Sequence, residues 1–183
     1  MTGSETTFIL GIPVPSADPF FLGTVGFHIA CGLAAVISGV GAMLNRKGRG
    51  THSRFGTIYF WSLFGVFVSM AILATIRWAE DYPLFILGSL AFASAFLGRA
   101  AIRRRMLRWH LVGMAASFIL MLTAFYVDNG KNLPLWRELP PIAFWLLPSA
   151  VGLPLIAYYI FRLPMVKHGI RSEPWLPRQE FPV

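Results

Sequence analysis

The stretch from Pro19 to Arg54 reads PFFLGTVGFHIACGLAAVISGVGAMLNRKGRGTHSR. Its first part, Pro19–Asn45, contains no Asp, Glu, Lys or Arg. A run of this length exceeds the roughly 20 apolar residues that cross a bilayer core of about 30 Å. The run ends in a loop whose cations are Arg46, Lys47, Arg49 and Arg54. Since cations collect in cytoplasmic loops, this stretch predicts a membrane helix whose C-terminal end faces the cytoplasm.

Four further uncharged runs repeat this pattern, and the loops between them alternate in charge. The runs are Phe55–Ile76, Tyr82–Gly98, Trp109–Val127 and Leu139–Phe161. The third loop is strongly basic, with Arg99, Arg103, Arg104, Arg105 and Arg108, and the C-terminal tail carries Arg162, Lys167, Arg171 and Arg178. The second and fourth loops instead mix acidic and basic residues. This alternation predicts five spans, with the N-terminus outside and the C-terminus inside.

The fold class expected is therefore all-α, an integral membrane bundle of five transmembrane helices. Charged residues make up 13% of the chain, against about 25% in a soluble domain. The expected domains are an outer N-terminal arm at 1–18, a transmembrane domain at 19–162 and a cytoplasmic C-terminal arm at 163–183. The expected spans are 19–44, 55–78, 83–101, 107–127 and 141–161.

Two features of the first helix stand out in the sequence. Asp18 before Pro19 is a typical helix start, with an N-cap acid followed by proline in the first turn. Small residues recur at four-residue spacing, which lets helices approach closely in lipid. These residues are Ala30, Ala34, Ser38 and Ala42. We therefore expect the first helix to be central in the bundle.

The formal net charge of +8 has two interpretations, nucleic-acid binding or membrane orientation. We exclude nucleic acid as a partner because the cations cluster on one predicted side of the membrane. On that side they would attract anionic lipids of the cytoplasmic leaflet. Cys31 is the single cysteine, so the sequence contains neither a disulfide framework nor a CxxC metal pattern.

His28 lies within the first predicted span and shares a polar face with Thr24, Cys31 and Ser38. An ionisable residue inside a membrane helix normally faces the bundle and indicates a functional site. Two interpretations remain open. His28 either donates a hydrogen bond to a neighbouring helix or ligates haem or a metal. We favour the hydrogen bond, because buried polar groups usually pair with one another.

A second group of candidates lies at the predicted cytoplasmic boundary. His52 precedes the second span and His110 begins the fourth, at a depth similar to that of Arg54, Arg99 and Arg103. Such a cluster could hold an anionic lipid headgroup, a quinone or a metal. We favour the lipid or structural interpretation, because arginine and histidine at this boundary suit phosphate groups.

The depth of each histidine limits a haem site. A bis-histidine haem needs two imidazoles at one level on facing helices. His28 and His110 differ in predicted depth by roughly 20 Å at 1.5 Å per residue. They cannot ligate one haem in a simple bundle. His52 with His110 is geometrically possible, but His52 is expected in the loop and not in the core of the bundle.

The predicted outer boundary collects residues of both charges, namely Arg77, Glu80, Asp81, Asp128 and Asn129. Paired carboxylates can bind a cation or relay protons, and Arg77 and Asp128 could form an ion pair. We favour ordinary surface ion pairs. The sequence has no P-loop, nucleophile elbow or HExxH motif, so no catalytic residue is assigned and the metal stays unknown.

Several motifs together resemble a widespread family of small bacterial multi-pass membrane proteins, a domain of unknown function. The motifs are HSRFGTIY at 52–59, RWAED at 77–81, His110, FYVDNG at 125–130 and LPLW at 133–136. The resemblance spans roughly Val25–Pro164. It implies a bacterial plasma (inner) membrane location and brings no established activity. Related sequences often carry a histidine just after the Glu-Asp pair, and this chain has Pro83 near that position, which weakens a histidine metal site there.

The functional expectation is a binding or interaction protein, an accessory subunit of a larger membrane complex. Its partners would be the lipid bilayer and either another membrane protein or a second copy of the chain. The rival is a redox protein that binds haem or quinone through its membrane histidines. A small transporter is a third class, suggested by His28 and by Pro148 and Pro154 in the fifth span.

Overall fold

The computed structural model describes residues 7–9, 12–14, 18–46, 50–134 and 136–162. The long helices are α1 (Pro19–Leu44), α2 (Thr51–Ile76), α3 (Trp78–Arg103), α4 (Leu107–Asn129) and α5 (Pro141–Arg162). All five are long and apolar enough to cross a membrane. A short 3-10 helix, η1 (Gly130–Asn132), follows α4, and a hairpin of β1 (Thr7–Ile9) and β2 (Ile12–Val14) precedes α1. The prediction of five apolar helices is confirmed, whereas the C-terminal arm at 163–183 lies outside the described residues.

Two helices begin earlier than expected. α2 begins at Thr51, directly after Gly50, whose φ of 114° favours glycine and lies outside the helical range. α3 begins at Trp78, with Pro83 inside its second turn. Arg77 is both the C-cap residue of α2 and the N-cap residue of α3. The two charged residues Glu80 and Asp81 therefore belong to the first turn of α3 and not to a loop.

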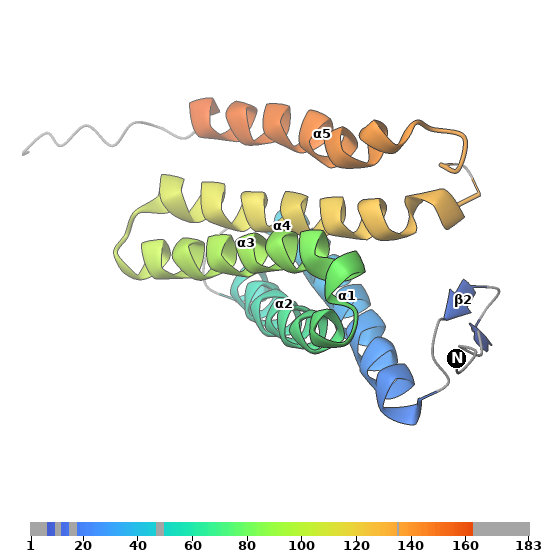
Figure 1. Ribbon diagram of the computed structural model, residues 1–183. Coiled ribbons are helices and arrows are strands. Elements are labelled where there is room, and N and C mark those ends of the chain that lie inside the picture. Colours follow the sequence, from blue (N-terminus) through green and yellow to red (C-terminus); the bar gives the residue numbers. More distant parts are fainter. Residues whose placement is uncertain (1–6, 10–11, 15–17, 47–49, 135, 163–183) are drawn as a thin grey trace, which may run out of the picture.

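Consecutive helices pack against each other, as expected for spans joined by short connections. Figure 1 shows α3, α4 and α5 running alongside one another, with α1 and α2 inclined beneath them. The most extensive contacts join α1 to α2 and α3 to α4, and α5 packs mainly against α4. The bundle therefore consists of two closely packed hairpins with α5 added on one side.

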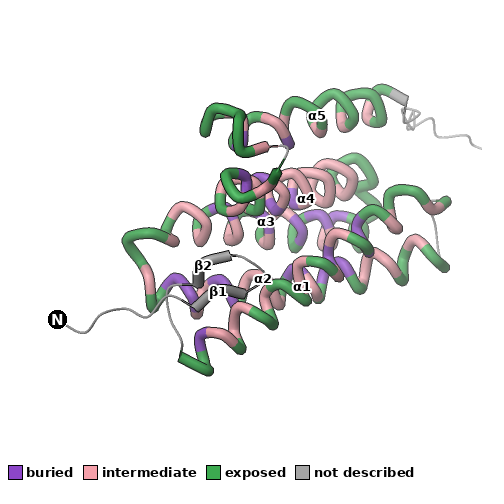
Figure 2. The backbone as a smooth tube through the Cα atoms, turned by 90° about the vertical axis from the view of Figure 1, so that its right-hand side faces the viewer, coloured by how far each residue is buried: buried purple, intermediate pink, exposed green. Residues whose placement is uncertain are grey.

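The core lies among α2, α3 and α4, with one edge of α1 completing it (Figure 2). Its buried members are Ala35, Tyr59, Phe60, Leu63, Ala91, Ala95 and Met121. The expectation that α1 is central is wrong, because its span is one of the two least buried and packs mainly on α2. Ala30 is exposed, whereas Ser38 is buried. Small residues permit close packing, but they do not determine how many neighbours a helix has.

The buried small-residue face belongs instead to α3, where Leu87, Ala91, Ala95, Gly98 and Ala101 are buried. This face meets α4 at two glycines that touch through their backbones. A Cβ on Gly98 would lie 2.9 Å from the Met114 nitrogen, and one on Gly113 would lie 2.7 Å from the Gly98 Cα. Because no side chain fits between them, these glycines fix the closest approach of α3 and α4.

Charge is separated between the two ends of the bundle. The connections α1–α2 and α3–α4 form one end, which we call the basic end. The start of α1 and the connections α2–α3 and α4–α5 form the opposite, mixed-charge end. All acidic residues in the described ranges lie at the mixed-charge end: Asp18, Glu80, Asp81, Asp128 and Glu138. That end also carries Arg77, Lys131 and Arg137. The described cations of the basic end are Arg46, Arg54, Arg99, Arg103, Arg104, Arg105, Arg108 and Arg162.

Candidate functional site

His28 joins α1 to α2 through a hydrogen bond. Its Nδ1 lies 2.9 Å from the Oγ of Ser69, a residue that is only 1% exposed. The Ser69 hydroxyl is directed at the Gly65 carbonyl, 2.7 Å away. Because that hydroxyl proton is already donated, the network assigns the Nδ1–H of His28 as the donor to Ser69. The Ser69 hydroxyl also lies 3.0 Å from the Val66 carbonyl.

Replacing Ser69 with alanine is expected to lower the free energy of unfolding by about 1 kcal/mol, within the range of interhelical hydrogen bonds in membranes. Ser62→Ala is the control, since the half-buried Ser62 lies on the same helix and the structure describes no hydrogen bond for it. We expect that control to change stability by less than about 0.5 kcal/mol. Unfolding in mixed micelles measures both variants, and equal losses would contradict a role for the His28–Ser69 bond.

The other two described histidines each close one hairpin at the basic end. His52 donates from Nδ1 to the Ala42 carbonyl at 2.8 Å, and His110 donates to the Gly98 carbonyl at 2.9 Å. Ala42 lies in the last turn of α1, where carbonyls have no partner within the helix. His52 therefore caps α1 from the start of α2. His110 links α4 to α3 at a carbonyl inside α3, before its last turn.

The three histidines thus hold two helix pairs at separate places: His28 and His52 both join α1 to α2, and His110 joins α3 to α4. His28 connects α1 with α2 towards the mixed-charge end, whereas His52 and His110 lie at the basic end on separate hairpins. In the described part of the chain, no three His, Cys, Asp or Glu residues group to hold a metal ion. Met106 is the N-cap residue of α4, and Met114 lies four residues after His110 in the same helix. The hydrogen bond described above for His110 is with a backbone carbonyl.

At the mixed-charge end, Arg77 forms an ion pair with Glu80, three residues further along the chain. The sequence also allowed a pair between Arg77 and Asp128, but the ion pair described for Arg77 is the one with Glu80. Asp128 instead accepts a hydrogen bond from the side chain of Asn129 at 3.2 Å. Its charge is also close enough to act on His28 and Asp81. Arg77, Glu80, Asp81, Asp128 and Asn129 all lie at the mixed-charge end. An exposed ion pair there adds at most about 1 kcal/mol.

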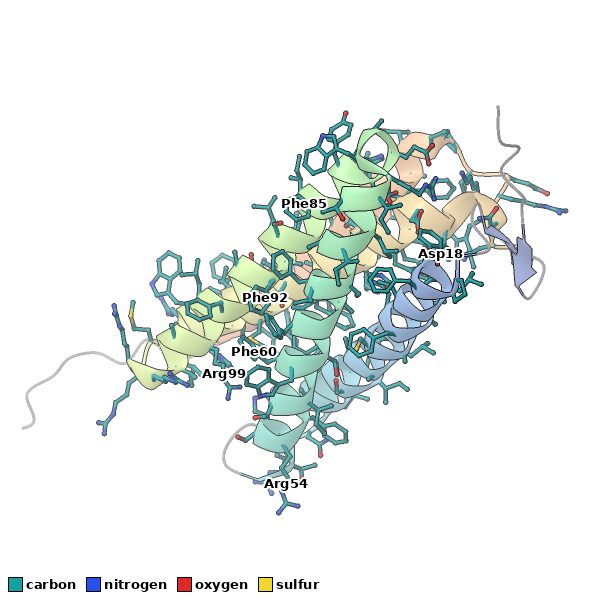
Figure 3. The ribbon with its side chains drawn as sticks, turned by 60° about the horizontal axis from the view of Figure 1, so that its bottom comes forward. Asp18, Arg54, Phe60, Phe85, Phe92 and Arg99 are labelled. Carbon is teal, nitrogen blue, oxygen red and sulfur yellow. The ribbon has the colours of Figure 1, made fainter. Side chains whose placement is uncertain are left out.

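The three arginines proposed for a headgroup site do not converge. Figure 3 shows Arg54 at the start of α2, pointing away from the bundle, and Arg99 turned towards Phe60. The Arg99 guanidinium lies 4.9 Å from the centre of that ring, a cation–π contact. Arg103 is exposed at the end of α3. Arg99 is thus engaged with α2, whereas Arg54 and Arg103 remain exposed on different connections of the basic end.

Sequence reasoning missed two structural groups. The first is the hydrogen bond between the Tyr59 and Ser117 hydroxyls, 2.8 Å apart and buried between α2 and α4. The second is an aromatic seam, in which Phe60, Phe64 and Phe67 of α2 surround Phe92 of α3. The phenylalanines recur at four- and three-residue spacing, which is the signal that could have indicated a shared helix face.

A groove of about 380 Å³ lies between α1 and α2 near the mixed-charge end. Its lining is mostly apolar and comprises Pro19, Phe20, Gly23, Thr24, Phe27, Val68, Ser69 and Ile72. Ser69 is also the partner of His28. The groove therefore combines an apolar surface with one hydrogen-bonded serine–histidine pair.

Comparison with known proteins adds no further constraint on this site. No family model, curated protein or solved structure matches the chain.

Proposed function

We propose that the chain is an integral membrane protein whose basic end faces the cytoplasm and whose N-terminus lies outside. The separation of charge along the bundle supports this orientation, because cytoplasmic loops are enriched in arginine and lysine. The family resemblance noted in the sequence favours the plasma membrane of a bacterium.

Within that membrane, the proposed role is that of an accessory subunit that binds another membrane protein through α5. The observation that carries this proposal is the pair of prolines in α5. Pro148 is buried on the α4 side, whereas Pro154 is exposed together with Ala150. Proline has no N–H, so Pro154 cannot supply the usual helical hydrogen bond to the Ala150 carbonyl. Lipid offers no donor to such a carbonyl, so this face suits contact with protein.

Photocrosslinking in native membranes tests this role. A photoreactive amino acid replaces Leu153 on the exposed face of α5 or, as the matched control, Ile37 on the exposed face of α1. We expect a discrete protein adduct from position 153 and lipid labelling alone from position 37. After gentle purification, native mass spectrometry should then detect a complex of the protein with the same partner. Monomer alone, with no adduct at position 153, would overturn the proposal.

The groove beside Ser69 favours a second candidate function, the binding of a quinone. A quinone tail suits the apolar lining, and the hydroxyl of a reduced quinone can donate a hydrogen bond to the Ser69 Oγ, which His28 holds in place. Titration of a quinone analogue, followed by quenching of tryptophan fluorescence, should then saturate and weaken in His28→Ala. A visible absorption spectrum of the purified protein tests haem independently. A colourless preparation that binds no quinone would eliminate this redox function.

A further inference from the structure

The turn between α3 and α4 uses an arginine where the backbone favours glycine. The Met106 N–H bonds to the Ala101 carbonyl and the Arg105 N–H to the Ile102 carbonyl, each at 3.0 Å. This pair of bonds is the Schellman motif, whose C′ residue adopts the left-handed conformation and is usually glycine. Arg105 occupies that position with a φ of 58°. A residue other than glycine is strained in this conformation, so the presence of arginine here indicates a role for its side chain.

Four exposed arginines crowd this turn, Arg103, Arg104, Arg105 and Arg108. Like charges this close repel one another, and no described acidic residue lies at the basic end to offset them. The single ion pair in the described ranges joins Arg77 to Glu80 at the opposite end. A bound anion would therefore relieve a repulsion that the protein itself leaves in place.

The type of cation indicates the type of anion. Membrane orientation would be served equally by lysine, yet all the cations at the end of α3, in the α3–α4 turn and at the start of α4 are arginines. The planar guanidinium matches the oxygens of a phosphate in two parallel hydrogen bonds, which an ammonium cannot do. The exposed apolar residues Met106, Leu107 and Trp109 adjoin the arginines. Such residues insert at the boundary between headgroups and acyl chains.

We infer that the α3–α4 turn, through Arg103, Arg104, Arg105 and Arg108, binds the phosphate groups of anionic phospholipids. The inference rests on the proposed membrane insertion, but it does not depend on a protein partner. The lipid class is one with a phosphodiester and no compensating cation, so phosphatidylglycerol is the probe and phosphatidylcholine is its zwitterionic control.

The test compares thermal unfolding in neutral detergent with and without each lipid. We expect phosphatidylglycerol, and not phosphatidylcholine, to raise the melting temperature of the wild-type protein. Arg105→Gly should fold at least as well as wild type in detergent alone, because glycine suits the left-handed position. Its affinity for phosphatidylglycerol should fall about fivefold, the loss of one interfacial cation. Arg137→Gln, which removes an exposed cation at the mixed-charge end, should leave that affinity unchanged.

Two further ligands in the same unfolding experiment identify the source of the phosphate. Inorganic phosphate or a short oligonucleotide, at the same phosphate concentration, should stabilise the protein far less than the lipid. Stabilisation by the oligonucleotide equal to that by the lipid would overturn the lipid assignment. Equal losses in Arg105→Gly and Arg137→Gln, or full affinity in Arg105→Gly, would overturn the site. Because the lipid is supplied in micelles, neither the cellular orientation nor failure to capture a protein partner affects the result.

Discussion

Gly113→Ala is expected to lower the free energy of unfolding by about 2–3 kcal/mol, the upper part of the range for overpacked sites. The added Cβ would lie 2.7 Å from the Gly98 Cα and 2.8 Å from both the Gly98 nitrogen and the Ser94 oxygen. All three atoms belong to the α3 backbone and cannot rotate away, so the two helices must separate. Denaturant titration in mixed micelles measures the change.

Gly26→Ala provides the matched control for that substitution. Gly26 is exposed on α1, and a Cβ there would have no atom within 4 Å. Since alanine favours a helix over glycine by about 1 kcal/mol, we expect Gly26→Ala to be neutral or stabilising. Similar effects of the two substitutions would contradict the backbone contact between α3 and α4.

Tyr59→Ala is expected to lower the free energy of unfolding by about 3–5 kcal/mol, the cost of removing a large buried ring. Tyr59 is 2% exposed and joins three helices. Its ring packs against Phe118 of α4, with centroids 6.1 Å apart, and lies against Gly39 of α1. Ile58→Ala is the control, because Ile58 is 50% exposed on the same turn of α2. Thermal unfolding in detergent compares the two variants, and a loss of similar size in both would contradict the central position of Tyr59.

A smaller substitution separates the packing of Tyr59 from its hydrogen bond. Tyr59→Phe removes the hydroxyl that lies 2.8 Å from the Ser117 Oγ but keeps the ring. We expect a loss of about 0.6–1 kcal/mol, the usual value for interhelical bonds in membranes. In a double-mutant cycle with Ser117→Ala, the two losses should not add. Strict additivity would show that the hydroxyls stabilise the fold independently of each other.

The positions of the spans could be predicted from the sequence because hydropathy and charge act locally. The start of α1 is an example, where Asp18 accepts a hydrogen bond from the Phe20 N–H at 3.1 Å as an N-cap residue. The starts of α2 and α3 are predicted less accurately from the sequence, because their cap residues lie outside the apolar runs. Thr51 and Trp78 both precede the apolar stretches, because charged and polar residues can extend a helix beyond the membrane core.

The contacts between helices could not be predicted in the same way. The partners of His52 and His110 are backbone carbonyls, which every residue possesses and no sequence pattern marks. No sequence pattern marks Ser69 or Ser117 either, because their roles come from their partners on other helices, His28 and Tyr59. For the same reason the small residues of α1 suggested a central helix, although α3 has the buried small-residue face. Tertiary arrangement, and not local composition, decides these features.

Labelling of single cysteines in intact cells tests the proposed orientation most directly. In a Cys31→Ser background, Asn132→Cys places a thiol at the mixed-charge end and Thr51→Cys places one at the basic end, both at exposed positions. A membrane-impermeant maleimide should label position 132 in intact cells and position 51 only after permeabilisation. The reverse pattern would contradict the orientation, and equal labelling of both positions in intact cells would contradict insertion across the membrane.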